Sequence, residues 1–293
     1  MKKISGIAPG WLLQVLLILP FSELRVWHFH RVSADLPHRS TFYDFLGQTT
    51  CNWRLLVLMV AFRLIEEFQT LTSPVQDRVL IVDDSPYKRD RSKRVEYLGR
   101  QYDHSSQCCY RGYRMLNLAC SDGYSLVPVD FELLTNSDAH KRLGPELKPD
   151  GRTQWGKRRQ AATGKATDQT LKMLERALNA GIRADYLIFD SWFAHPGLLL
   201  YLSRKLPVVC MLKNSGKISF RHGKPICQLE GLYQKMAGRK RQGKTNDSQI
   251  LGSILVDMLS GPRVRIVFVC DRRNSGRWPA RTSVTCVAFG NAS

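Results

Sequence analysis

The chain has 293 residues, of which 43% are hydrophobic, so it can bury a core in one large domain or two modest ones. Lysine and arginine exceed aspartate and glutamate by 44 − 25 = 19, which favours nucleic acid as the partner over a ribosome-associated or membrane-surface role. The eight cysteines include no C-x-x-C pair, which argues against a zinc finger and indicates reduced thiols in a cytoplasmic protein.

The N-terminal region, residues 1–75, is predicted to be an incomplete helical piece. Two lysines precede an apolar run over residues 11–21 and so imitate a signal peptide, but histidines and an arginine follow where a small-residue cleavage site belongs. The run is also too short to span a bilayer, so we interpret it as a buried helix or as sequence altered by truncation. We expect no membrane contact.

Two further helices are expected in the same region. Ser40 or Thr41 is predicted to cap a short helix that ends near Phe45, and Asn52 to cap a longer one. The longer helix carries apolar residues at helical spacing, namely Leu55, Leu58, Met59, Phe62 and Ile65.

The second region, residues 76–212, alternates between strand and helix patterns. It opens with residues 79–82, a β-branched run typical of a strand buried on both faces, which Pro86 is expected to end. A hairpin is predicted next, with strands near residues 115–119 and 125–131 joined by a Ser-Asp-Gly turn. The polar, basic residues 135–159 are expected to form a loop.

The rest of this region is predicted to be a helix-to-strand unit and its repeat. A helix begins at Thr167 or Asp168 and stops at Gly181, where a left-handed residue ends a helix. A strand, a helix and a strand are then expected at residues 186–189, 196–204 and 208–212. The order of these elements predicts an α/β fold with a mixed sheet.

The C-terminal part is divided into an insertion and a tail. Residues 213–262 are basic and punctuated by glycine, which predicts a β-rich insertion. Residues 263–293 are expected to hold the last strand, at 265–269, and an aberrant truncated tail without useful periodicity.

Two of the predicted buried strands end in aspartate. Asp83 and Asp84 follow the first strand, and Asp190 follows the strand at 186–189. Neighbouring strands that deliver carboxylates to one rim of a sheet bring like charges together, and such pairs usually hold a divalent metal or share a proton. Carboxylate oxygens favour Mg²⁺ or Mn²⁺, which can clamp the attacking and leaving oxygens of a phosphodiester. One such aspartate alone more often starts a turn, so the pair carries the prediction.

Several motifs between residues 40 and 273 resemble, in order and spacing, the DDE transposases of insertion sequences. These motifs are Ser40–Leu46, Asn52–Arg54, Val79–Glu96, Gly112–Leu116, Asp122–Gly123, Pro128–Phe131 and Leu187–Phe193. The resemblance implies an RNase H-like mixed sheet with flanking helices, and DNA cleavage and joining by two aspartates and a glutamate that bind Mg²⁺ or Mn²⁺. Asp190 matches the second aspartate. The first is Asp83 or Asp84, and we favour Asp84 because Asp84–Ser85 mirrors Asp190–Ser191.

The glutamate that the resemblance implies has no counterpart in this sequence. It is expected on a helix after the last strand, but no glutamate follows Glu230. Glu132, Glu175 and Glu230 are candidate substitutes, and none occupies the right place. A frameshift or premature stop would produce this pattern, so we expect a transposase that is inactive as this polypeptide. The alternative is a non-catalytic DNA-binding remnant.

Two blocks of basic residues are expected to contact DNA phosphates, with transposon ends and target DNA as partners and a homodimer as a candidate assembly. The alternative is a pair of solvated surface loops. The residues are Lys88, Arg89, Arg91, Lys93, Arg94, Arg239, Lys240, Arg241 and Lys244.

The second basic block also contains a match to the phosphate-binding P-loop pattern, at Gly238–Thr245. No buried strand leads into it, and too few residues follow for the parallel sheet of a nucleotide-binding core. A P-loop nucleotide hydrolase is therefore the least favoured alternative.

Overall fold

The computed structural model of the chain describes residues 6–22, 36–73, 75–146, 148–214, 216–237, 250–270 and 282–288. These residues divide into two compact units. The smaller unit belongs to Met1–Trp53 and Glu146–Ala161, and the larger to Arg54–Pro145 and Ala162–Ser293. No helix in the described ranges is long and apolar enough to cross a membrane.

The smaller unit is helical and has a core of its own. Its elements are α1 (Pro9–Ile18), η1 (Leu19–Phe21), α3 (Arg39–Leu46) and most of α5 (Gln154–Ala162). Leu12 of α1 packs with Phe42 and Phe45 of α3, and it is the only buried residue of α1. The predicted helix is therefore present, but most of its residues are not buried. His38 caps α3 in place of the predicted Ser40 or Thr41, because its ring nitrogen accepts the backbone N–H of Ser40.

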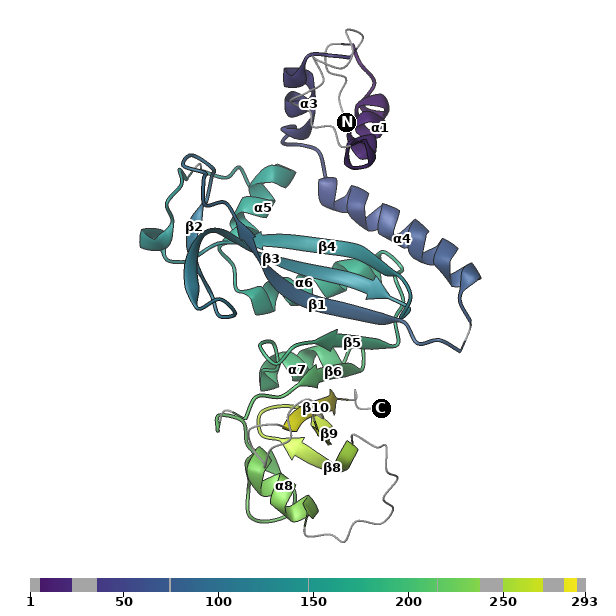
Figure 1. Ribbon diagram of the computed structural model, residues 1–293, viewed down its shortest axis with the longest axis vertical. Helices are drawn as coiled ribbons and strands as arrows, with labels where there is room; N and C mark the ends of the chain where they lie inside the picture. Colours follow the sequence, from purple (N-terminus) through teal and green to yellow (C-terminus); the bar gives the residue numbers. More distant parts are fainter. Residues whose placement is uncertain are drawn as a thin grey trace. The chain divides into compact units, whose positions relative to one another are not determined.

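The larger unit contains the sheet and the remaining helices (Figure 1). The strands are β1 (Val79–Lys88), β2 (Gly99–Asp103), β3 (Cys108–Ser121), β4 (Leu126–Leu134), β5 (Tyr186–Phe189), β6 (Val208–Met211), β7 (Phe220–Arg221), β8 (Ile250–Met258), β9 (Arg263–Cys270) and β10 (Thr282–Ala288). The helices are α4 (Trp53–Leu71, from Arg54 onward in this unit), η3 (Ala139–Lys141), α6 (Ala166–Asn179), α7 (Pro196–Ser203) and α8 (Leu229–Ala237).

Five strands of this unit form an RNase H-like sheet, which confirms the predicted fold class. They lie in the order β4-β3-β1-β5-β6. β4, β3 and β1 are antiparallel neighbours, whereas β5 is parallel to β1 and β6 is parallel to β5. The two parallel pairs require crossover connections, and α6 and α7 lie in them as predicted.

β1 is longer than predicted, because Pro86 does not end it. The backbone groups of alternate residues point to opposite sides of a strand. Arg89 donates its N–H to Arg111 on the β3 side, so the nitrogen of Pro86 points to the other side. There β1 pairs with β5 only as far as Val82, and a proline on an open edge removes no ladder hydrogen bond.

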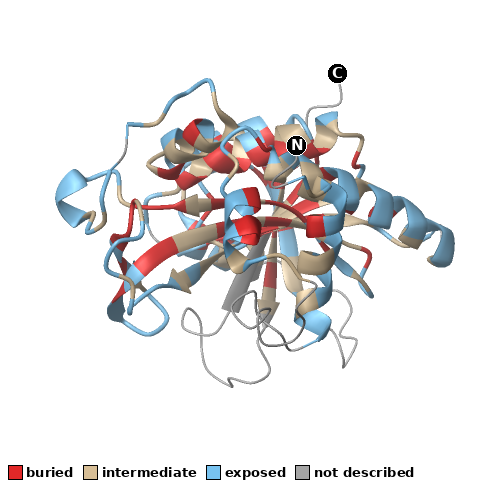
Figure 2. Ribbon diagram, turned by 90° about the horizontal axis from the view of Figure 1, so that it is seen from above, coloured by how far each residue is buried: buried red, intermediate tan, exposed pale blue. Residues whose placement is uncertain are grey.

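The core of the larger unit lies where the sheet meets its helices, and buried residues gather on these strands and helices in Figure 2. The β1 and β5 residues with alternating burial, such as Leu80 and Leu187, supply one side of this core. Met173, Leu174 and Ala177 of α6 supply the other, and α6 contacts β3 and β4. This packing holds Val82 of β1 beside Phe189, the last residue of β5.

Three elements correct the predictions for the polar regions. α5 begins at Gln154, inside residues 135–159, which were expected to be a loop; its mostly polar sequence gives no apolar periodicity from which a helix could be predicted. α8 forms inside the predicted β-rich insertion. The predicted last strand, 265–269, is β9, and β10 follows it and pairs with both β6 and β9. Part of the predicted aberrant tail, 271–281 and 289–293, lies outside the described residues.

Candidate active site

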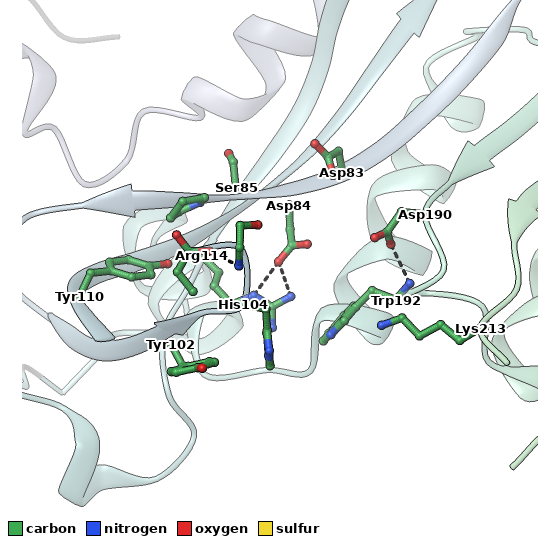
Figure 3. Close-up of a pocket in the computed structure, with 13 residues that line it drawn as sticks. Asp83, Asp84, Ser85, Tyr102, His104, Tyr110, Arg114, Asp190, Trp192 and Lys213 are labelled. Atoms are coloured by element: carbon green, nitrogen blue, oxygen red, sulfur yellow. Dashed lines mark hydrogen bonds and ion pairs between the residues drawn. The ribbon is translucent and has the colours of Figure 1, made fainter. Parts of the chain in front are cut away.

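The two aspartate-bearing strands lie side by side, and the ladder between them ends just before the aspartates. The parallel ladder between β1 and β5 runs as far as Val82 opposite Phe189, and Asp83, Asp84 and Asp190 follow directly. All three aspartates line one cavity of about 640 Å³, whose lining is drawn in Figure 3. The fold therefore gathers carboxylates from separate parts of the chain at one rim of the sheet.

Asp84 is held by an arginine from the neighbouring strand. Arg114 of β3 donates from Nε and Nη2 to Asp84 Oδ2, at 2.7 and 2.5 Å. The guanidinium carbon of Arg114 also lies 4.3 Å from the ring centre of Trp192. Asp83 points to the opposite side of β1 and is exposed (Figure 3). Asp84, on the side of the strand that carries the buried Val82, is thus the more constrained of the two carboxylates.

A tight turn after β5 fixes Asp190. The backbone N–H of Trp192 donates to Asp190 Oδ1 at 2.8 Å, and the N–H of Phe193 donates to the Asp190 carbonyl at 3.3 Å. Phe193 is fully buried and anchors the turn in the core. The backbone amide therefore orients one oxygen of the Asp190 carboxylate.

The hairpin that joins β2 and β3 forms the far wall of the cavity. Its Asp103 accepts the hydroxyl of Ser106 at 2.8 Å and the N–H of Ser105 at 2.9 Å, and these bonds lower the pKa of the Asp103 carboxyl. Burial raises the pKa of Tyr110 to about 12, so its hydroxyl stays protonated at neutral pH and cannot act as a general base. Sequence reasoning missed these residues because it did not predict β2.

Asp84 and Asp190 form a donor set that fits a hard divalent cation. Arg114 binds Asp84 through Oδ2, and the Trp192 amide binds Asp190 through Oδ1. Mg²⁺ commonly binds through one or two carboxylates and completes its shell with water and substrate phosphates. The described residues contain no group of three side chains placed to hold one metal ion together.

The candidate substitutes for the glutamate have other partners. Glu132 of β4 is buried and pairs with Arg54. Glu175 of α6 accepts the hydroxyl of Tyr201 at 2.7 Å. Glu230 lies in the first turn of α8, and none of the three lines the aspartate cavity.

The first block of predicted DNA-contacting residues is exposed. Lys88, Arg89, Arg91, Lys93 and Arg94 lie at the end of β1 and in the connection to β2. In this connection Arg89 donates to the Tyr87 hydroxyl at 2.8 Å. The second block, Arg239, Lys240, Arg241 and Lys244, and the P-loop match around it lie outside the described residues.

Comparison with known proteins agrees with this geometry. The profile of a family described as DDE superfamily endonuclease matches residues 30–258, so the chain belongs to that family. A search of curated proteins finds no significant match.

Among solved structures, the Drosophila P element transposase strand transfer complex is similar over 64% of this chain and 34% of that chain, at 13% identity and a TM-score of 0.30. The chain thus spans about a third of that transposase, and a TM-score this low does not establish a shared fold.

Proposed function

We propose that the chain is a transposase of the DDE type and that Asp84 and Asp190 hold a divalent cation, Mg²⁺ or Mn²⁺, against a DNA phosphodiester. The observation that carries this proposal is the position of the two carboxylates in one cavity, where the parallel ladder between β1 and β5 ends. Membership of the DDE superfamily endonuclease family supports it independently.

The roles of the individual side chains follow from their contacts. Arg114 orients Asp84 through Oδ2 and leaves Oδ1 for a cation, and the Trp192 amide does the same for Asp190 through Oδ1. We assign the first aspartate to Asp84 because Asp83 points away from this arrangement. The exposed Lys213 at the cavity wall would attract the phosphodiester. A bound divalent ion supplies charge stabilisation for the phosphodiester oxygens.

DNA is the proposed partner, as transposon ends and as target, and a homodimer is the proposed assembly. The chain has a net charge of +19, so its basic residues outnumber its acids. Contact with phosphates is further supported by an exposed basic block, which consists of Lys88, Arg89, Arg91, Lys93 and Arg94. Binding of this kind is strongly weakened by salt and largely independent of sequence.

We further propose that this polypeptide binds DNA without cutting it. A two-metal phosphoryl-transfer site needs more ligands than two aspartates. Asp83 and Asp103 also line the cavity, but Asp83 points to the other side of β1, Asp103 is bonded to Ser105 and Ser106, and the described residues contain no group of three side chains that could hold one metal ion. This favours the second candidate function, a non-catalytic DNA-binding protein that retains the fold and two of the three acids.

The test combines a binding assay with a nicking assay. Supercoiled plasmid is incubated with the chain in Mg²⁺ or Mn²⁺, and binding to a fluorescent duplex is measured over a range of salt. We expect salt-sensitive binding and no nicking. The control is Asp257→Asn, on the exposed face of β8. If the chain nicks the plasmid and Asp190→Asn abolishes nicking while Asp257→Asn does not, the chain is an active enzyme. That result would refute the proposed inactivity but not the proposed DNA binding. A chain that binds no duplex at low salt would refute the proposed function.

A further inference from the structure

A second cavity adjoins the aspartate cavity. It has a volume of about 390 Å³, and Arg114 and Trp192 line both cavities. Its remaining wall comes from Gln101 of β2, from residues 134–137 at and after the end of β4, and from residues 163–167 before and at the start of α6. No described carboxylate lines it, whereas Arg114 and Lys165 are cationic. Its chemistry is therefore that of an anion site.

Gln101, which lines this cavity, has a buried amide with an unused donor. Gln101 is 6% exposed, and its Nε2 has no hydrogen-bond partner. A buried amide donor without a partner costs free energy, so such a group is normally satisfied by a polar ligand or water. Gly99 leaves room for this amide, because a Cβ there would lie 2.9 Å from Gln101 Nε2 and 2.5 Å from Thr135 Oγ1.

The start of α6 supplies further donors to the same cavity. The helix has 14 residues, and its N-cap residue, Lys165, makes no side-chain cap hydrogen bond. The first backbone N–H groups of a helix lack partners within the helix, and the helix dipole favours an anion beside them. Ala166 and Thr167, the first two residues of α6, both line the cavity. Asp168 in the first turn is exposed and does not line it.

We propose that this second cavity binds a backbone phosphate of the DNA whose neighbouring phosphodiester lies at Asp84 and Asp190. The inference rests on the proposed function, which brings a DNA strand to the adjoining cavity. Gln101, the first turn of α6 and Lys165 supply neutral and charged donors, the combination that binds phosphate at helix N-termini. Because Arg114 and Trp192 line both cavities, a DNA strand bound at the two aspartates would continue into the second cavity.

Inorganic phosphate is the first probe. The thermal midpoint of the intact chain is measured in sodium phosphate and in sodium chloride of equal ionic strength. We expect phosphate to raise the midpoint of the wild-type chain and to lose this effect in Lys165→Gln and Gln101→Met. Gln101→Met should also raise the midpoint in chloride, because methionine leaves no buried donor unsatisfied. Lys172→Gln, an exposed residue elsewhere on α6, is the charge-matched control and should keep the phosphate effect.

A fluorescent 30-base-pair duplex is the second probe and separates DNA from free phosphate. Lys165→Gln should weaken binding about tenfold at low salt and reduce the slope of log K against log salt by about one, whereas Lys172→Gln should stay within about twofold of wild type. Equal effects of the two lysine variants would overturn the site. Lost phosphate protection with unchanged duplex affinity would indicate a free-anion site and overturn the assignment to DNA.

These outcomes are distinct from failure of the proposed function. If the wild-type chain binds duplex and Lys165→Gln binds equally well, the inference fails and the proposed function stands. If the wild-type chain binds no duplex, the proposed function fails, and the phosphate measurement then reports a free-anion site, which also overturns the DNA assignment.

Discussion

Replacing Asp130 by alanine should destabilise the larger unit more than any surface change. The Asp130 side chain on β4 is fully buried and accepts Arg176 Nε at 2.7 Å and the N–H of Phe131 at 2.8 Å. Arg54 Nε lies 3.2 Å from Asp130 Oδ1. Arg54 belongs to α4 and Arg176 to α6, so one carboxylate ties two helices to the sheet.

The size of the effect follows from the charges that remain. With Asp130 present, the two arginines face two acids, Asp130 and Glu132. Asp130→Ala leaves Arg54 with Glu132 and removes the acid that pairs with Arg176, and these arginine side chains are only 16% and 29% exposed. Breaking a buried pair from one side costs about 3–5 kcal/mol, and the partial exposure of the arginines places the expected loss at about 3 kcal/mol.

Urea unfolding measures this loss. The urea concentration at the midpoint should fall, while the slope of the unfolding free energy against urea stays unchanged. This combination identifies a change of stability. Glu66→Ala is the control, because the Arg63–Glu66 pair is exposed and should contribute about 0.5 kcal/mol or less. An Asp130→Ala loss below about 1 kcal/mol, or no greater than that of Glu66→Ala, would refute the view that this cluster fastens the helices.

Three further changes test other parts of the structure. Arg114→Gln removes a positive charge beside Asp84 and should tighten Mn²⁺ binding about tenfold in calorimetry, because that charge repels a cation at Oδ1; unchanged affinity would show that the arginine charge does not oppose the cation. Burial raises the pKa of the Cys120 thiol to about 11, whereas the unfolded thiol ionises near 9, so urea midpoints should fall as pH rises from 9 to 11 and should fall less in Cys120→Ala. Gly112→Ala places a Cβ 2.1 Å from a β1 carbonyl and should lower the thermal midpoint by several degrees, whereas Gly10→Ala, with open space around it, should not.

The parts of the fold that the sequence predicted well are those with local signals. β1 and β5 are short apolar runs, and α6 has an apolar face and a glycine at its end, with φ of +93° at Gly181. Aspartates that directly follow apolar runs predicted which carboxylates meet at one rim of the sheet. α8 also carried a readable signal that was missed, with apolar residues at positions 229, 232, 233 and 236.

The rest of the site depends on contacts between distant residues. Arg114 reaches Asp84 only through the register of β1 against β3, which no local pattern encodes. Gln101 acquires its buried, unpaired amide from the packing of β2 against the segment after β4. Both follow from the tertiary structure, so a sequence pattern reveals the two acids but not the groups that surround them.

The position of β10 affects how the larger unit is made. β10 is the last described strand to be synthesised, yet it lies between β6 and β9 in the interior of the sheet. Until it emerges, the nascent chain holds β6 and the β8–β9 hairpin with unpaired edges, and such edges template association with other chains. The time between synthesis of β9 and docking of β10 is therefore a period in which these edges expose the protein to aggregation.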